Sequence, residues 1–304
     1  MNILIVGAGA VGQVYGRHLA QAGHSVTFFV KPAHRASLEH GLPLHRLGWW
    51  RLRSETWRGY EILDRTDDVA ARHWDQVWLC VAATALASPL TREVVGAAGA
   101  ATVVCLQPGP DSAGQVRSWL GDPAQLVQGL ITFISYQSPL PGQPGPRGMA
   151  YFLSALAPGL FCGDTARVEP VLQALRQGGM SARRVMDYDQ AAGGSDSLLI
   201  PLIAALELNG WRLAEMAGSE ALAALAAERG ARIGAQKLLL TAPALRALLV
   251  LAPRVLPLAL GPYLEFHFSK VGQQTREMLD SYIAVGERQG LPVGRLQELR
   301  SRLP

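Results

Sequence analysis

Residues 2–12 read Asn-Ile-Leu-Ile-Val-Gly-Ala-Gly-Ala-Val-Gly, and this stretch decides the fold of the amino-terminal part of the chain. An apolar run at residues 2–6 leads into the glycines, residues 10–22 have helical spacing, and a second apolar run covers residues 25–30. Short apolar runs predict buried strands, and apolar residues at a 3.6-residue period predict a helix. The order strand, helix, strand predicts the start of a βαβ unit.

The three glycines of this stretch form a G-x-G-x-x-G motif between the predicted strand and helix. In that context the first glycine permits a tight turn, the second lets the backbone approach a pyrophosphate, and the third lets the helix pack on the strand. The first helical turn offers N–H groups and a partial positive charge to phosphates. We predict dinucleotide binding here; the alternative is a glycine turn without a ligand. The predicted contacts are Gly7, Ala8, Gly9, Ala10, Val11 and Gly12.

The residues after the second predicted strand indicate which dinucleotide binds. In NAD-binding proteins of this type an Asp or Glu about twenty residues after the glycines binds the ribose hydroxyls. Here the first acidic residue of the chain is Glu39, and the strand ends in Lys31, followed by His34 and Arg35. A carboxylate would repel the adenosine 2′-phosphate, whereas Lys31 and Arg35 would attract it. We therefore predict NADP(H) as the cofactor, with a solvated surface charge as the alternative role of Lys31.

The rest of the chain divides into two parts of different character. Strand-like runs follow at residues 76–81, 101–106, 126–135, 150–154 and 160–162, with helical patterns between several of them. This alternation predicts a mostly parallel sheet with helices on both faces. Residues 138–148 are too rich in proline and glycine for regular structure and predict a loop. After the glycine pair at 193–194 the strand signals end, and long helical stretches follow.

The predicted fold class is therefore α/β, with two domains, as expected for 304 residues. Residues 1–187 are predicted to form a Rossmann domain with a mostly parallel sheet, and residues 188–304 an all-helical carboxy-terminal domain that holds the substrate or a second copy of the chain. The apolar stretch at residues 238–264 is interrupted by Arg246, Arg254 and four prolines. We expect buried helices there and no membrane contact; the alternative is a segment that lies at a membrane surface.

Composition narrows the possible partners. The net charge is +4, but the basic residues are scattered and form no stripe, so we expect no nucleic-acid binding. The amino terminus lacks the pattern of a signal peptide, which predicts a cytoplasmic protein. Cys80, Cys105 and Cys162 are odd in number and widely spaced, a pattern typical of free thiols, and we predict no metal site. The expected partner is a small-molecule substrate, and a homodimer is possible.

Several motifs, taken in order, resemble the ketopantoate reductase family. They are residues 2–12, the Gly-His-Ser-Val turn at 23–26 with Lys31 after it, Gly-Leu-Ile-Thr at 129–132, Leu-Phe-Cys-Gly at 160–163, and the tail at 280–293. The resemblance implies a Rossmann domain followed by a helical domain, NADPH bound by the first, and a 2-keto acid held between them. It also implies a lysine on the first helix of the second domain that polarises and protonates the carbonyl.

The sequence departs from that family at the positions of the substrate. It has no lysine between Lys31 and Lys237. Without gaps, the family's Lys, Asn, Asn series falls on Leu199, Ile203 and Glu207. Its Asn-Gly after the fifth strand falls on residues 107–109, its lysine after the fourth strand near Ala83 and Thr84, and its substrate-binding Glu on Gln274. We therefore predict a substrate other than ketopantoate.

Other side chains would have to supply the proton for carbonyl or imine reduction. The candidate catalytic residues are Gln107, Glu207, His267 and Lys270. For each of them the alternative is a helix cap or a surface group without a role in catalysis. Val81 and Gln107, at the ends of predicted strands, complete the predicted cofactor contacts. Two functions follow: an NADPH-dependent reductase of a carbonyl, such as a 2-keto acid, or of an imine, and an NADP(H)-binding protein without turnover.

Overall fold

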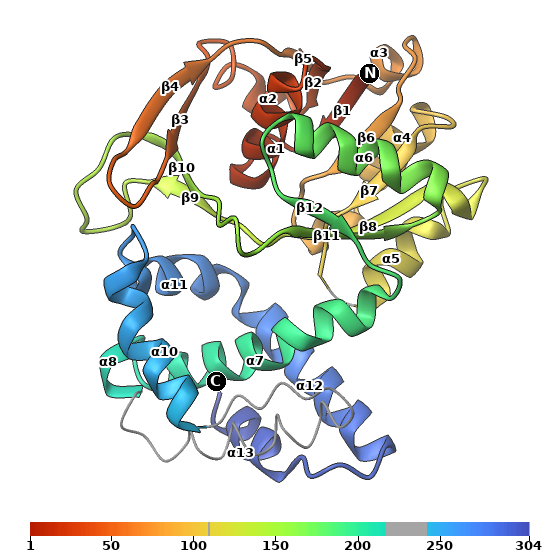
Figure 1. The fold of residues 1–304 in the computed structure, drawn as a ribbon. Coiled ribbons are helices and arrows are strands. Elements are labelled where there is room, and N and C mark those ends of the chain that lie inside the picture. The colour runs from red at the N-terminus through yellow and green to blue at the C-terminus, as the bar shows by residue number, and fades with distance from the viewer. Residues whose placement is uncertain (109, 217–241, 304) are drawn as a thin grey trace. The chain divides into compact units, whose positions relative to one another are not determined.

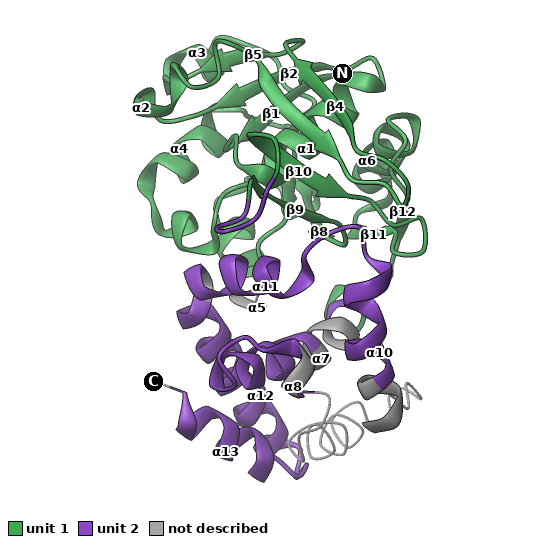
Figure 2. Ribbon diagram, turned by 90° about the vertical axis from the view of Figure 1, so that its left-hand side faces the viewer, with its two compact units in different colours: residues 1–139, 145–191 green, residues 140–144, 192–304 purple. Residues whose placement is uncertain are grey.

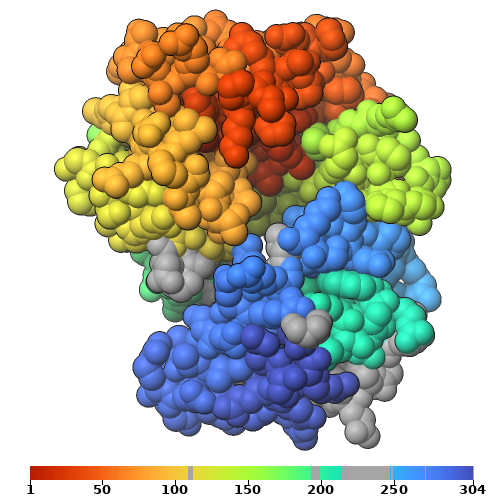
Figure 3. Space-filling view, turned by 180° about the vertical axis from the view of Figure 1, so that it is seen from behind, coloured from red at the N-terminus to blue at the C-terminus, as the bar shows by residue number. Residues whose placement is uncertain are grey.

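The computed structural model describes residues 1–108, 110–216 and 242–303 (Figure 1). The chain divides into two compact units (Figure 2). Unit 1 comprises residues 1–139 and 145–191, and unit 2 comprises residues 140–144 and 192–304. The predicted domain boundary, residue 188, is the first residue of α7 (Tyr188–Leu208). In the space-filling view the red and orange residues form the upper surface of unit 1, and yellow residues lie beside them (Figure 3).

Unit 1 is built on an eight-stranded sheet with the order β12-β11-β8-β7-β6-β1-β2-β5. All neighbouring strands are parallel except β8 and β11, so the predicted mostly parallel sheet is confirmed. The strands are β1 (Asn2–Val6), β2 (Ser25–Phe29), β5 (Glu61–Leu63), β6 (Gln76–Leu79), β7 (Thr102–Cys105), β8 (Leu126–Leu130), β11 (Gly159–Gly163) and β12 (Ala182–Arg184).

Both faces of this sheet are buried, as β1 shows. Its alternate residues Ile3 and Ile5 pack into one core cluster, and Leu4 and Val6 pack into another. The first cluster includes α1 (Ala10–Gln21) and α6 (Thr165–Gln177), and the second includes α3 (Thr66–Ala70), α4 (Pro89–Ala97) and α5 (Pro110–Arg117). A strand that is buried on both faces reads as a continuous apolar run, which is why residues 2–6 could be recognised from sequence.

A second, four-stranded sheet has the order β4-β3-β10-β9. Its strands are β3 (Leu42–Arg46), β4 (Arg53–Trp57), β9 (Ile134–Ser138) and β10 (Gly148–Phe152). The single strand predicted at residues 126–135 is wrong: β8 ends at Leu130, and β9 begins at Ile134 in the other sheet. The connecting residues are apolar because Phe133 packs edge-on against Tyr15 in the core, so no polar break marks the crossing. The predicted loop lies between β9 and β10.

Unit 2 contains only helices within the residues that the structure describes, as predicted for the carboxy-terminal part. They are α7, α8 (Leu213–Met216), α10 (Ala242–Val255), α11 (Leu260–Phe268), the short 3-10 helix η3 (Ser269–Val271), α12 (Gly272–Arg288) and α13 (Gly294–Arg302). The expectation of buried helices at 238–264 is wrong in part, because Leu251 and Val255 on α10 are half exposed. Residues 238–241 lie outside the described residues.

In the described part of the chain, no single helix has the length and apolarity needed to cross a membrane. Leu249–Val255 and Leu260–Phe268 meet that test only together, and they are bent by 103° at the break between them.

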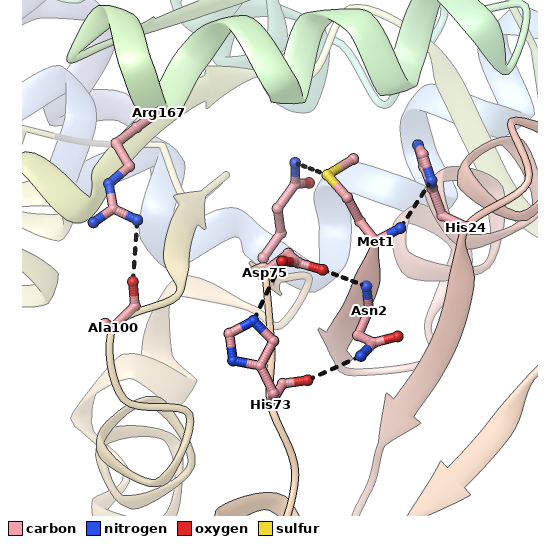
Figure 4. Close-up of polar contacts among 8 residues, drawn as sticks. Met1, Asn2, His24, His73, Asp75, Ala100 and Arg167 are labelled. Atoms are coloured by element: carbon pink, nitrogen blue, oxygen red, sulfur yellow. Dashed lines mark hydrogen bonds and ion pairs between the residues drawn. The ribbon is translucent and has the colours of Figure 1, made fainter.

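The amino-terminal edge of the main sheet is tied together by polar contacts (Figure 4). The backbone N–H of Asn2 donates to Oδ2 of Asp75 at 2.7 Å, and the backbone N–H of Asp75 donates to the carbonyl of Asn2 at 3.0 Å. Asn2 Nδ2 also donates to the carbonyl of His73, and Arg167 donates to the carbonyl of Ala100. These bonds join the start of β1 to the chain before β6 and hold α6 to the chain before β7.

Candidate functional site

The opposite, carboxyl-terminal edge of the sheet carries the candidate site. β1 lies between β2 and β6, so the chain leaves β1 towards one side and later returns on the other. Ligands of open α/β sheets bind where the connections diverge in this way. A cavity of about 850 Å³ opens there, a volume within the range of small-molecule sites. Its lining comes from unit 1, mainly from the segments that follow β1, β2 and β6.

The glycine turn after β1 forms one wall of this cavity, through Gly7, Ala8 and Gly9. Gly7 has φ +99°, and a Cβ there would lie 2.8 Å from the carbonyl oxygen of Cys80. A Cβ on Gly12 would lie 2.2 Å from the carbonyl oxygen of Gly7. A Cβ on Gly9 would meet no atom within 4 Å. The first and third glycines are therefore required by the protein itself, whereas the second faces open space in which a ligand can approach the backbone.

The start of α1 supplies donors beside this turn. Gly9 is the N-cap, and the first intrahelical bond runs from the N–H of Gln13 to the carbonyl of Gly9 at 2.9 Å. The N–H groups of Ala10, Val11 and Gly12 consequently have no partner within α1. The first turn contains no acidic residue to oppose an anion. Ala10, Val11 and Gly12 are not among the residues that line the cavity, so their predicted contacts with a cofactor stay predictions. Their contribution would come from the N–H groups and the helix dipole beside the turn.

The segment after β2 gives the cavity its basic end. Lys31, His34 and Ser37 line it; His34 lies on α2 (Pro32–Arg35), and Lys31 and Ser37 flank that helix. Arg35 is not among the lining residues; its guanidinium pairs with Asp64 at 3.2 Å and with Glu39 at 3.6 Å. Of the described residues that line the cavity, none is an Asp or a Glu. The described lining of the site thus has a positive end and carries no carboxylate.

The structure adds lining residues that were not among the predicted cofactor contacts. His34, which lies three residues after Lys31, shares its face of the helical turn, and this spacing could have indicated it. Ser37 follows on the same segment, and its Oγ donates to the carbonyl of His34 at 2.6 Å. Gln13 on α1 is buried, lines the cavity and donates through Nε2 to the carbonyl of Ala8 at 2.8 Å. Nothing in the sequence indicated Gln13.

The two remaining candidates of unit 1 lie at the ends of β6 and β7. Val81 lines the cavity, as its predicted role requires. Gln107 is buried and is not among the lining residues. Its Nε2 donates to the carbonyls of Leu79, at 2.9 Å, and Val81, at 2.8 Å, so both amide hydrogens are engaged with the backbone.

The candidate proton donors of unit 2 also have partners there. Glu207 Oε1 accepts a bond from Arg276 at 2.8 Å, and the Nζ of Lys270 lies 3.4 Å above the ring centre of Phe266. The ring of His267 stacks on Tyr263 with 5.5 Å between centroids. Partial burial and the charge of Lys270 lower the pKa of His267. Their catalytic roles stay predictions.

The fold of unit 1 and its glycine turn are those of the Rossmann class. Residues 3–144 match the family model described as ketopantoate reductase PanE/ApbA, which confirms the predicted resemblance. No curated protein matches the sequence.

Solved structures extend the likeness to both units. The 2-dehydropantoate 2-reductase from Geobacter metallireducens GS-15 is 17% identical with a TM-score of 0.70, over 100% of this chain and 99% of that one. D-mandelate dehydrogenase, solved with NADH and anilino(oxo)acetate, is 16% identical with a TM-score of 0.72, over 99% and 96%. A putative ketopantoate reductase from Ralstonia solanacearum MolK2 is 18% identical with a TM-score of 0.69, over 98% and 95%. At these identities the likeness shows the fold.

Proposed function

We propose that this protein is an oxidoreductase that binds NADP(H) in the cavity of unit 1 and reduces a carbonyl, such as that of a 2-keto acid, or an imine. The observation that carries the proposal is the cavity at the point where the connections diverge, with a glycine turn on one wall and Lys31 at one end. The match of residues 3–144 to a reductase family supports the same class of reaction.

The residues present fit a dinucleotide. Gly9 leaves space beside the backbone where a pyrophosphate would lie, and the first turn of α1 would donate N–H groups to it. Val81 would contact the cofactor from the neighbouring strand end. When bound, NADPH supplies the hydride, and the protein positions it.

The preference for NADP(H) is argued from Lys31 and not from the fold, because one protein of this fold was solved with NADH. A hydrogen bond between charged groups contributes about 1.5–3 kcal/mol, or roughly 10- to 100-fold in affinity. Lys31 and His34 line one end of the cavity, where they would attract a 2′-phosphate. No described residue of the lining is a carboxylate that would bind ribose hydroxyls. The ion pairs of Arg35 with Asp64 and Glu39 make it a weaker candidate than Lys31.

The substrate is proposed to differ from ketopantoate. The positions where the resemblance places polar substrate residues carry Leu199 and Ile203, and the chain has no lysine between Lys31 and Lys237. Apolar side chains at those positions favour a more apolar carbonyl or imine.

The second candidate function is NADP(H) binding without turnover. It is favoured by the engagement of the predicted donors: Gln107 bonds to two backbone carbonyls, Glu207 pairs with Arg276, and Lys270 lies over Phe266. A reductase needs a proton donor within hydrogen-bond reach of the substrate.

Turnover separates the two candidates. Purified protein with saturating NADPH is presented with a panel of 2-keto acids, ketones and imines that includes ketopantoate, and NADPH oxidation is followed. Oxidation with a panel member other than ketopantoate supports the reductase. NADPH binding with no oxidation across the panel supports the second function, and preferential turnover of ketopantoate contradicts the proposed substrate class.

A further inference from the structure

Two buried glutamines make matching hydrogen bonds at opposite edges of the main sheet. At the carboxyl-terminal edge, Gln107 Nε2 donates to the carbonyls of Leu79 and Val81 at 2.9 and 2.8 Å. At the amino-terminal edge, Gln125 Nε2 donates to the carbonyls of Gly99 and Ala101, both at 3.0 Å. The two residues are 5% and 4% exposed. Each amide therefore bridges the carbonyls of residues i and i+2 at the end of a neighbouring strand.

The backbone that Gln107 holds forms part of the nucleotide cavity. Cys80 and Val81 line the cavity. They also support the glycine turn: a Cβ on Gly7 would lie 2.8 Å from the carbonyl oxygen of Cys80 and 2.9 Å from Cγ1 of Val81. Because the turn and the 79–81 segment are packed this closely, a shift of the segment would change the wall against which the dinucleotide lies. The backbone held by Gln125, by contrast, does not line this cavity.

The orientation of the Gln107 amide is fixed by a third bond. Cys105 Sγ donates to Gln107 Oε1 at 3.3 Å. Burial raises the pKa of the Cys105 thiol to about 11, so the group stays protonated and remains a donor at neutral pH. With the thiol on the oxygen, the two amide hydrogens are directed to the two carbonyls. The side chain is thus committed to the backbone instead of to a substrate.

We propose that Gln107 is a positioning residue for the dinucleotide, which acts by holding the 79–81 backbone against Gly7, and that Gln125 is a purely structural counterpart. The inference rests on the proposed function, since it requires that the nucleotide binds in the cavity of unit 1. It gives Gln107 a role that is distinct from proton donation and from direct contact with the cofactor.

The test compares Gln107→Met with Gln125→Met. Methionine keeps the length of the side chain and removes the amide, so both variants leave two carbonyls without their donor. Tm and the Kd values for NADPH and NADH are measured for the two variants and the natural protein. We expect Tm to decrease by similar amounts in the two variants. In Gln107→Met both Kd values should rise about tenfold, so that the ratio of the Kd for NADH to the Kd for NADPH is unchanged. In Gln125→Met both Kd values should change by less than about twofold.

The outcomes are distinguishable. Equal losses of affinity in the two variants, or an unchanged Kd in Gln107→Met, overturn the positioning role while leaving the proposed function standing. A natural protein that binds neither nucleotide overturns the proposed function and this inference with it. If a methionine variant does not fold, the corresponding Gln→Asn pair, with the amide one carbon closer to the backbone, is used. We then expect Kd to rise in Gln107→Asn, by less than the rise expected for Gln107→Met, and to stay unchanged in Gln125→Asn. If Gln107→Asn binds the nucleotides as tightly as the natural protein does, the proposal is overturned.

Discussion

The two edges of the main sheet differ in how their polar groups are satisfied. At the amino-terminal edge the protein uses its own side chains: Asp75 accepts from the N–H of Asn2, and Gln125 bridges two carbonyls. A cavity of about 470 Å³ there is lined by Arg72, but this charge already pairs with Glu61. At the carboxyl-terminal edge the first turn of α1 has N–H groups without intrahelical partners, next to a cavity of about 850 Å³.

The difference distinguishes polar groups that stabilise the fold from polar groups that are available to a ligand. A side chain that completes the hydrogen bonds of a strand end stabilises the fold, as Gln125 does at the amino-terminal edge and Gln107 at the carboxyl-terminal edge. Where helical N–H groups and a positive charge lie beside a cavity, an anionic ligand can bind to them. Substitutions that change the wall of the larger cavity should therefore affect nucleotide binding, and substitutions that only disturb packing, or that lie elsewhere, should affect stability or nothing.

The largest effect is expected from Gly9→Asp. The new carboxylate would occupy the open space beside the turn, where a pyrophosphate would lie, and a juxtaposition of like charges costs several kcal/mol. We expect the NADPH affinity to fall by roughly 1000-fold, as measured by nicotinamide fluorescence. Gly121→Asp is the control, because Gly121 is also exposed and also has no atom within 4 Å of an added Cβ. Tight NADPH binding by Gly9→Asp would contradict the proposal that the pyrophosphate lies beside this turn.

Gly12→Ala should act on stability. The added Cβ would lie 2.2 Å from the carbonyl oxygen of Gly7, so α1 and β1 would have to separate. We expect a loss of about 3 kcal/mol in the free energy of unfolding, measured by urea denaturation. Gly9→Ala meets no protein atom and should leave the unfolding free energy nearly unchanged while it weakens nucleotide binding. Equal stability losses in the two variants would contradict the division of roles among the glycines.

Lys31→Glu should change the selectivity for the cofactor. Reversal of the charge at the basic end of the cavity should weaken NADPH by about 10- to 100-fold, whereas NADH, which lacks the 2′-phosphate, should change by less than about threefold. Arg117→Glu, at an exposed position in the last turn of α5, is the charge-matched control. Titration with both nucleotides measures the effect, and equal weakening of NADPH and NADH would refute the 2′-phosphate contact.

The smallest effect concerns pH and the other end of α1. His18 is buried, its Nδ1 lies 2.6 Å from the carbonyl oxygen of Gly178, and burial lowers its pKa. As the pH falls below about 6.5, His18 is protonated in the unfolded chain before it is protonated in the folded protein. The free energy of unfolding therefore keeps the full contribution of neutral His18 above that pH and decreases below it. The titration of one histidine lowers the free energy of unfolding by at most about 1.4 kcal/mol per pH unit.

Urea denaturation at a series of pH values from about 5 to about 8, roughly the range in which histidine titrates, measures this effect. His18→Gln should show a shallower decrease of the unfolding free energy at acid pH than the natural protein. The exposed His40 supplies the control, His40→Gln, which should keep the natural slope. An unchanged slope in His18→Gln would show that other groups carry the acid sensitivity.

The sequence predicted those parts of the fold that depend on local pattern. β1, α1 and β2 follow from apolar runs around a glycine turn, and the helical character of unit 2 follows from the end of the strand signals after residue 194. β3, β4, β5 and β12 were missed. β4 is mostly exposed and polar, and β5 and β12 are three-residue strands, so their pairing depends on neighbours that are distant in sequence.

The site was predictable to the same degree. The glycine turn and Lys31 are local signals, and both line the cavity. The structure alone shows that Arg35 turns towards Asp64 and that Gln13 faces the cavity, because these orientations depend on tertiary packing. Gln107 was placed at the end of a strand from sequence, but its bonds to β6 depend on which strands are adjacent.

The central claim is that the carboxyl-terminal edge of the main sheet binds NADP(H). Its most direct test is a calorimetric titration of the purified natural protein with NADPH and, separately, with NADH. We expect one nucleotide bound per chain and a Kd for NADPH that is at least about tenfold lower than that for NADH, as a charged contact to the 2′-phosphate requires. Equal affinities, a preference for NADH, or no binding of either nucleotide would contradict the claim.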